Sequence, residues 1–157
     1  MAAYAERAAT GDQHERRVRL ELQRRPDWTV TPWGQSILPE ATRQALRDSR
    51  SRFRHFPDLV ASRPGEIVTI DAKDRMRSTE TARYAVAREC VSFGLQFFAA
   101  FSIPVYYVFG NLGVLCPTEV ASYGRLAPGG AYYLVSERLA HQFDDVFGYP
   151  QMGSAAA

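Results

Sequence analysis

The sequence predicts an α/β fold, because segments with the apolar spacing of helices alternate along the chain with short segments rich in β-forming residues. The chain has 157 residues and is 46% hydrophobic, so it is long enough to bury a core. We expect residues 1–150 to form a single domain and residues 151–157 to form a disordered tail.

The first predicted helix covers residues 12–25 and places Val18 and Leu22 on one face. Asp12 and Glu15 have the spacing of a capping box at its start. Residues 28–31 alternate as a short strand after the helix.

The next segment, residues 39–54, is rich in Ala, Leu, Gln and Arg, and Pro39 suits a first helical turn. It is therefore predicted to be an inserted helix. A second strand continues through Leu59 and Val60, and turn-forming residues 63–66 connect it to a third strand over residues 67–72.

The second half of the chain is expected to begin with a long helix that Ser78 or Thr79 caps and that ends near Phe101. Its apolar residues recur at helical spacing and are read as core. Strands are predicted at residues 105–109, 113–116 and 132–135, and Ser136 is predicted to cap a final helix over residues 137–147.

Lysine occurs once in this chain. Of the 19 Lys and Arg residues, 18 are arginines, and the exception is Lys73, in Asp71-Ala72-Lys73 at the end of the third predicted strand. Arginine presents a wide planar fork that stays charged, whereas lysine is a compact point charge whose pKa shifts on burial. A single lysine in an arginine-rich chain therefore indicates a place where the amine itself matters.

Two aspartates accompany this amine. Residues two apart in a strand face the same side, so Asp71 and Lys73 are expected to project together. Asp58, in Phe56-Pro57-Asp58, would add a second carboxylate from the adjacent strand. Hard oxygen ligands of this kind suit Mg²⁺, which binds one or two carboxylates, several waters and substrate phosphates.

The pattern of Pro57-Asp58 followed by Asp71-Ala72-Lys73 resembles the PD-(D/E)xK nuclease superfamily, which includes restriction enzymes, Holliday-junction resolvases and repair nucleases. The resemblance spans roughly residues 14–147 and is specific in the motif region. It implies a restriction-endonuclease-like sandwich in which helices flank a central mixed β-sheet, and the helical insert near residues 39–54 departs from the compact resolvases.

The same resemblance implies a metal-dependent endonuclease that hydrolyses phosphodiester bonds of DNA, with branched or structured DNA as a candidate substrate. In the family pattern, Asp58, Asp71 and the Ala72 carbonyl bind Mg²⁺, for which Mn²⁺ can substitute, and Lys73 contacts the attacking water. The resolvase-like branch adds an acid on the first helix. Glu15 is preferred because it lies farther from the helix end, Glu21 is the competing candidate, and a capping or solvated role for Glu15 remains open.

Positive charge is uneven although the net charge is only +2. Arginines gather at residues 16–25 and 43–54, which indicates either a nucleic-acid face or two solvated helix faces. The candidate phosphate contacts are Arg16, Arg17, Arg75 and Arg77. We expect DNA as the partner and a homodimer, because cutting a duplex usually takes two sites.

Other classes of function find little support in the sequence. No stretch is long and apolar enough to span a membrane, and no secretory signal is recognised, so a cytoplasmic protein is expected. Cys90 and Cys116 are expected to be buried free thiols. Two alternatives to an enzyme stay open: a non-catalytic DNA-binding or scaffolding protein with this fold, and a mobile-element accessory protein that recognises structured DNA without cutting it.

Overall fold

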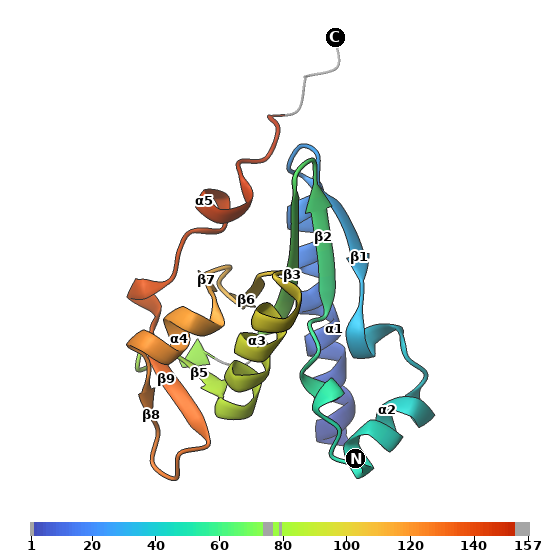
Figure 1. The fold of residues 1–157 in the computed structure, drawn as a ribbon, viewed down its shortest axis with the longest axis vertical. Helices are drawn as coiled ribbons and strands as arrows, with labels where there is room; N and C mark the ends of the chain where they lie inside the picture. The colour runs from blue at the N-terminus through green and yellow to red at the C-terminus, as the bar shows by residue number, and fades with distance from the viewer. Residues whose placement is uncertain (1, 74–76, 79, 153–157) are drawn as a thin grey trace.

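The computed structural model describes residues 2–73, 77–78 and 80–152, without the side chains of residues 2–10 and Arg77. Figure 1 shows the arrangement of its elements. The helices are α1 (Ala2–Gln23), α2 (Glu40–Asp48), α3 (Arg88–Phe101), α4 (Pro117–Tyr123) and α5 (Phe143–Phe147), with short 3₁₀ helices η1 (Gly34–Ile37), η2 (Arg52–His55) and η3 (Glu137–Leu139). The strands are β1 (Thr29–Pro32), β2 (Leu59–Arg63), β3 (Glu66–Lys73), β4 (Arg77–Ser78), β5 (Arg83–Ala87), β6 (Val105–Phe109), β7 (Val114–Leu115), β8 (Arg125–Leu126) and β9 (Tyr132–Ser136).

The larger sheet among the described residues is mixed, as the sequence predicts. Its strand order is β1-β2-β3-β6-β7, and β3 pairs with β6 in parallel while the other neighbours are antiparallel. A smaller antiparallel sheet has the order β4-β5-β9-β8. In the parallel pair, Asp71 lies opposite Tyr107, so the motif strand occupies the centre of the larger sheet.

Two hydrophobic cores cover the two faces of β3 and β6. On one face, Val18 and Leu22 of α1 pack with Val68 and Ile70 of β3, and Figure 1 shows α1 running behind β1 and β2. The other core joins α3, α4 and the smaller sheet to β6. Its buried members are Tyr84, Val86, Cys90, Val91, Phe97, Val105, Tyr107, Phe109, Leu115, Val120 and Val135.

Alternation along the strand decides where the motif points. Because Val68 and Ile70 face α1, Asp71 lies on the opposite face, toward α3, together with its register partner Tyr107. This face carries the aromatic and thiol side chains of the second core. The motif carboxylate is therefore held against α3 rather than exposed on an open sheet.

The hairpin of β2 and β3 confirms the prediction made from its turn residues. Arg63 pairs with Glu66 across Pro64-Gly65, and Gly65 has a φ of +78°, a conformation that glycine adopts readily. The strand predictions at residues 28–31, 105–109 and 132–135 are also confirmed to within a residue or so. The short strand predicted at 113–116 is β7.

The predicted start of the first helix is wrong. Helix α1 begins at Ala2, so Asp12 and Glu15 lie inside it and do not form a capping box. The alanine-rich residues before Gly11 favour continuation. A single glycine inside a helix costs only about 1 kcal/mol relative to alanine, so Gly11 does not stop the helix.

The predicted long helix is also wrong in its first half. Residues Arg83–Ala87 form β5, in which Tyr84 and Val86 are buried and pair with β9, and α3 starts only at Arg88. Ala82, just before the strand, has a φ of +49°, which a continuing right-handed helix excludes. Thr79, one of the two predicted caps, lies outside the described residues.

The helical insert and the final helix are shorter than predicted. The insert ends as α2 at Asp48 and resumes as η2, with Arg50 at a φ of +52° between them. The final helix is divided into η3 and α5, because His141 exchanges two backbone hydrogen bonds with Val114 of β7 (3.0 and 2.9 Å). None of the helices among the described residues is both long and apolar enough to cross a membrane.

Candidate active site

The side chains of Asp71 and Lys73 meet on the face of β3 that packs against α3. The Lys73 Nζ donates to Asp71 Oδ2 at 2.7 Å. Cys90, in the first turn of α3, lies 3.3 Å from both, donating its Sγ proton to Asp71 Oδ2 and accepting from Lys73 Nζ. Only 15% of the Lys73 side chain and 11% of the Asp71 side chain are exposed, so the pair is largely shielded from solvent. We call Asp58, Asp71, Lys73 and Cys90 the carboxylate–lysine cluster.

Tyr107 of β6 forms the floor beneath the amine. The Lys73 Nζ lies 5.3 Å from the centroid of the Tyr107 ring, within the range of a cation–π contact. The Tyr107 hydroxyl donates to the Cys90 carbonyl at 3.2 Å and so ties β6 to the start of α3. The amine is therefore held by contacts from β3, β6 and α3.

Asp58 enters the cluster from the residue before β2. Leu59 pairs with Ile70, so the antiparallel register continues to place Asp58 opposite Asp71. Its Oδ2 accepts a hydrogen bond of 2.8 Å from the backbone amide of Ala72. The Ala72 peptide, lying between the two motif residues, thereby anchors the second carboxylate beside the first.

The electrostatics of the cluster follow from burial. Burial and then the neighbouring Asp71 charge raise the pKa of Asp58 well above its usual value. Burial alone would lower the pKa of Lys73, but the charge and hydrogen bond of Asp71 outweigh it and raise this pKa. Burial and Asp71 raise the pKa of the Cys90 thiol to about 12. At neutral pH, Lys73 is an ammonium and Cys90 a neutral thiol, so neither group acts as a proton acceptor.

The donor set fits a hard divalent cation. Asp58 and Asp71 each keep an Oδ1 that accepts no hydrogen bond from the residues that the structure describes. A cation between two carboxylates would also relieve the repulsion that raises the pKa of Asp58. Within the described part of the chain, no three His, Cys, Asp or Glu side chains group closely enough to hold a metal by themselves. Mg²⁺ needs no such group, because water and substrate phosphate complete its shell.

Glu15 and Glu21 occupy different environments on α1. Glu15 is partly buried in a cavity of about 420 Å³ between α1, η1 and α2. Burial raises the pKa of Glu15, and its charge in turn contributes to the raised pKa of Asp58. Glu21 instead pairs with Arg24 and with the buried Arg25. Of these two acids, Glu15 is the one whose charge contributes to the raised pKa of Asp58, and no hydrogen bond joins their side chains.

The four arginines predicted to contact phosphates have different surroundings. Arg16 is exposed and lines the same cavity as Glu15. Arg17 donates through Nη1 to the Gly110 carbonyl at 2.8 Å, which fixes α1 to the end of β6. Arg75 lies outside the described residues, and so does the side chain of Arg77.

Sequence reasoning did not find the role of Cys90 in the cluster. Cys90 was read as a core residue, and the structure does bury it, with 4% exposure, as a free thiol. Its contact with Asp71 and Lys73 depends on where α3 begins, and the predicted long helix concealed that start. Arg25, counted as part of an arginine face, is 5% exposed and pairs with Glu21 and Asp144, so it holds α1 to α5 instead.

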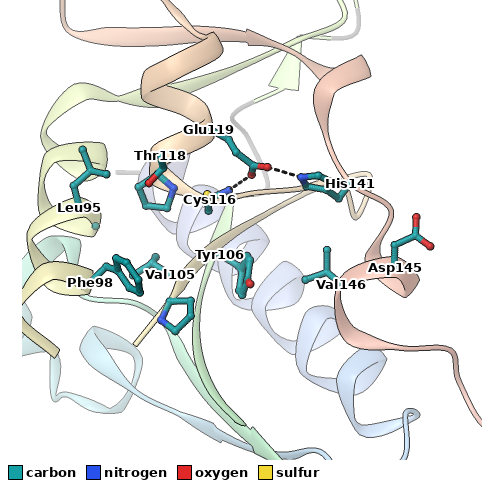
Figure 2. A pocket seen from close by; sticks show the side chains of 13 residues that line it. Leu95, Phe98, Val105, Tyr106, Cys116, Thr118, Glu119, His141, Asp145 and Val146 are labelled. Atoms are coloured by element: carbon teal, nitrogen blue, oxygen red, sulfur yellow. Dashed lines mark hydrogen bonds and ion pairs between the residues drawn. The ribbon is translucent and has the colours of Figure 1, made fainter. Parts of the chain in front are cut away.

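A larger cavity of about 540 Å³ lies elsewhere, between α3, β6, α4 and α5, and Figure 2 shows its lining. The Glu119 carboxylate accepts hydrogen bonds from His141 and from the Cys116 amide there. Burial raises the pKa of the Cys116 thiol, so the thiol is not a ready nucleophile. No member of the carboxylate–lysine cluster lines this cavity.

Helices cover a mixed sheet whose central strand carries Asp71 and Lys73, with Asp58 just before the neighbouring strand, and this arrangement is a restriction-endonuclease-like α/β fold. Among the solved structures that share it is the 1.6 Å structure of Hjc, a Holliday junction resolvase from the archaeal hyperthermophile Archaeoglobus fulgidus. The TM-score is 0.58, over 90% of this chain and 98% of that chain, with 14% sequence identity. This likeness confirms the predicted fold. A comparison with protein-family models found no match, and neither did a comparison with curated proteins.

Proposed function

We propose that this protein is a metal-dependent endonuclease that hydrolyses phosphodiester bonds in branched or structured DNA. The observation that carries the proposal is the convergence of Asp58, Asp71 and Lys73, which joins one buried and one partly buried carboxylate to an ammonium 2.7 Å from Asp71. The fold shared with a Holliday junction resolvase supports the choice of branched DNA.

The roles follow from the chemistry of each group. Asp58, Asp71 and the Ala72 carbonyl would hold Mg²⁺, with Mn²⁺ as a substitute. The metal would supply a polarised phosphate and a bound water of lowered pKa. Lys73, as an ammonium, would donate a hydrogen bond to the attacking water and offset the negative charge that develops on the phosphorus oxygens. Cys90 would keep that amine in place from the side of α3.

Groups around the cluster would bind the rest of the substrate. We propose that Glu15 reaches the metal site through water, since it lies partly buried on α1 and contributes to the raised pKa of Asp58 without a hydrogen bond to it. Arg16, Arg75 and Arg77 are proposed as contacts to flanking phosphates. Arg17 would use the guanidinium nitrogens that its bond to Gly110 leaves available.

The proposal also covers the domain organisation, the oligomeric state and the location of the protein. Residues 1–150 would act as one domain, because β6 contributes to both hydrophobic cores. A homodimer would place two clusters on the two strands to be cut. A DNA substrate would place the protein in the cytoplasm of its cell.

The test is cleavage of an end-labelled four-way junction by the purified chain. We expect cleavage with Mg²⁺ or Mn²⁺, binding but little cleavage with Ca²⁺, and no cleavage in chelator. Asp71→Asn should abolish cleavage while binding holds, because it removes a negative charge near the phosphates. Undiminished cleavage in chelator would refute the metal mechanism. Tight binding of the junction without cleavage in any divalent metal would favour the non-catalytic alternative.

A further inference from the structure

Two adjoining cavities lie beside the carboxylate–lysine cluster, and both are formed where the insert meets α3. The first has a volume of about 470 Å³ and is basic, and the second, of about 310 Å³, is aromatic. Arg52 and Gln96 line both, so the two cavities form one strip. The basic cavity is lined by Arg50, Arg52, Arg54, His55, Arg88, Glu89, Ser92 and Gln96. The aromatic cavity is lined by Arg52, Phe53, Phe56, Phe93, Gln96, Phe97 and Phe101.

The charge of the basic cavity favours a polyanion. Four arginines line it, three from the insert and Arg88 from α3, and among the described lining residues Glu89 alone is acidic. Glu89 pairs with Arg54 at 2.6 Å and with His55 at 3.3 Å. Its side chain is 70% exposed, so this pairing is weak and open to replacement by a phosphate.

The aromatic cavity offers flat surfaces beside those arginines. Phe53 stacks on Phe56 with ring centroids 4.7 Å apart and an angle of 18° between the rings. Phe53 is 36% exposed and Phe101 is 61% exposed, values that are high for phenylalanine. The guanidinium of Arg52 lies 5.7 Å from the centroid of the Phe93 ring, so the charge and the rings are interleaved.

The strip begins next to the cluster. Arg88 and Glu89 line the basic cavity, and the next residue of α3, Cys90, contacts both Asp71 and Lys73. Burial lowers the pKa of the His55 imidazole, and the positive charge of Lys73 lowers it further. A strand lying along the strip would therefore lead directly to the site where cleavage is proposed.

We propose that this strip binds an unpaired DNA strand that adjoins the scissile phosphate, with its phosphates on Arg50, Arg52 and Arg88 and its bases stacked on Phe53 and Phe101. Alternating phosphates and π-faces are the features of a single strand, whereas a duplex keeps its bases stacked on one another and offers the strip only phosphates. The inference rests on the proposed function and predicts that, among branched substrates, those with a single-stranded segment at the cut bind most tightly.

The test is a fluorescence-anisotropy titration in chelator, so that binding is measured without cleavage. The probes are a duplex with a single-stranded tail, a blunt duplex and a single strand, all of one sequence. Phe53→Ala and Phe101→Ala should each weaken binding of the tailed duplex and the single strand by about 10-fold and leave the blunt duplex unchanged. Arg52→Gln should reduce the slope of log Kd against log salt for the single strand by ~0.7.

Two matched controls separate the strip from the rest of the surface. Phe98→Ala removes an exposed phenylalanine from the same helix, but one that lines the other, larger cavity. Arg125→Gln removes an exposed arginine of β8 in the smaller sheet. Both should bind all three probes like the wild type. If Phe53→Ala lowers the melting temperature, the test depends on Phe101→Ala, because Phe101 is the more exposed of the two residues.

Several outcomes would overturn the proposal. One is equal affinity for tailed and blunt duplexes, and another is tail binding that survives both phenylalanine substitutions. A change of oligomeric state in the phenylalanine variants with unchanged DNA binding would assign the strip to a protein interface instead. Equal cleavage of DNA with and without single-stranded tails would refute this inference alone. Binding of tailed DNA with no cleavage under any metal would refute the nuclease function and would still support single-strand binding by the strip.

Discussion

Replacing Lys73 by arginine keeps the positive charge and changes its shape. The amine sits between Asp71 Oδ2 at 2.7 Å and Cys90 Sγ at 3.3 Å, over the ring of Tyr107, and only 15% of the side chain is exposed. A guanidinium is wider, planar and longer, so it cannot occupy this position without moving Cys90 or turning toward solvent. Either movement takes the donor away from the position proposed for the attacking water.

The magnitude follows from the loss of one positioned donor. Removing such a group from a shielded site costs roughly 10²- to 10³-fold in rate. We expect Lys73→Arg to lower the single-turnover rate of junction cleavage with Mg²⁺ by at least ~10²-fold, which is about 2.7 kcal/mol of transition-state stabilisation. Binding of the same junction with Ca²⁺ should change by less than about 3-fold, because the net charge is preserved.

The assay must separate a misplaced donor from a disturbed fold. Lys73→Met is the matched variant, because it keeps an unbranched side chain and removes the charge, so it should lose at least as much rate as Lys73→Arg. Cys90→Ala should cost less, since it removes only a contact to the amine. Lys73→Arg cleaving at close to the wild-type rate would refute the special role of the amine. Loss of junction binding in Lys73→Arg would show that Lys73 stabilises the fold and does not act in the reaction.

Three further predictions concern stability. The folded state raises the pKa of Asp58, so metal-free protein gains stability from this group below about pH 4 and loses it as pH rises through the raised pKa. Asp58→Asn should therefore melt at a higher temperature than the wild type at pH 7.5 in chelator, with the difference vanishing at low pH; equal melting at both pH values would contradict this. Arg25→Gln should destabilise the fold by about 2–3 kcal/mol in urea unfolding, because it leaves Asp144 unpaired beside a buried site, and a purely DNA-binding defect would refute that role. Gly94→Ala should lower stability by about 1–3 kcal/mol, since a Cβ there would lie 2.5 Å from Pro117 Cγ, and an unchanged melting temperature would show that α4 moves freely.

Local patterns were enough to predict the motif strand and its hairpin. Pro64-Gly65 marks the turn, and the alternation through Val68 and Ile70 determines that Asp71 and Lys73 share a face. The register of the hairpin then accounts for the approach of Asp58, because Leu59 pairs with Ile70 and the residue before Leu59 therefore lies opposite Asp71. These relations involve residues close in sequence, which is why they could be read without the structure.

Long-range pairing determined what the sequence could not reveal. Tyr84 and Val86 fit a period of two, while Val86 and Cys90 fit a helical spacing, so the pattern alone does not separate β5 from α3. The pairing of β5 with β9, some fifty residues later in the chain, decides in favour of a strand. The break in the final helix has the same origin, because His141 finds its partner in Val114. The role of Cys90 in the cluster followed only once the start of α3 was known.

The parallel pairing of β3 with β6 separates the cluster into parts that the chain can assemble at different times. Asp58 and Asp71 meet through a single hairpin, whose loop is short and whose closure costs little entropy. Lys73 bonds to Asp71 within the same strand, but its contacts to Cys90 and Tyr107 form only when the crossover through β5 and α3 has closed, and contacts of high contact order form slowly. A nascent chain that has folded only as far as β3 would thus carry both carboxylates and an amine that lacks its contacts to Cys90 and Tyr107. The proposed DNA cleavage would therefore become possible last, once the whole fold has formed.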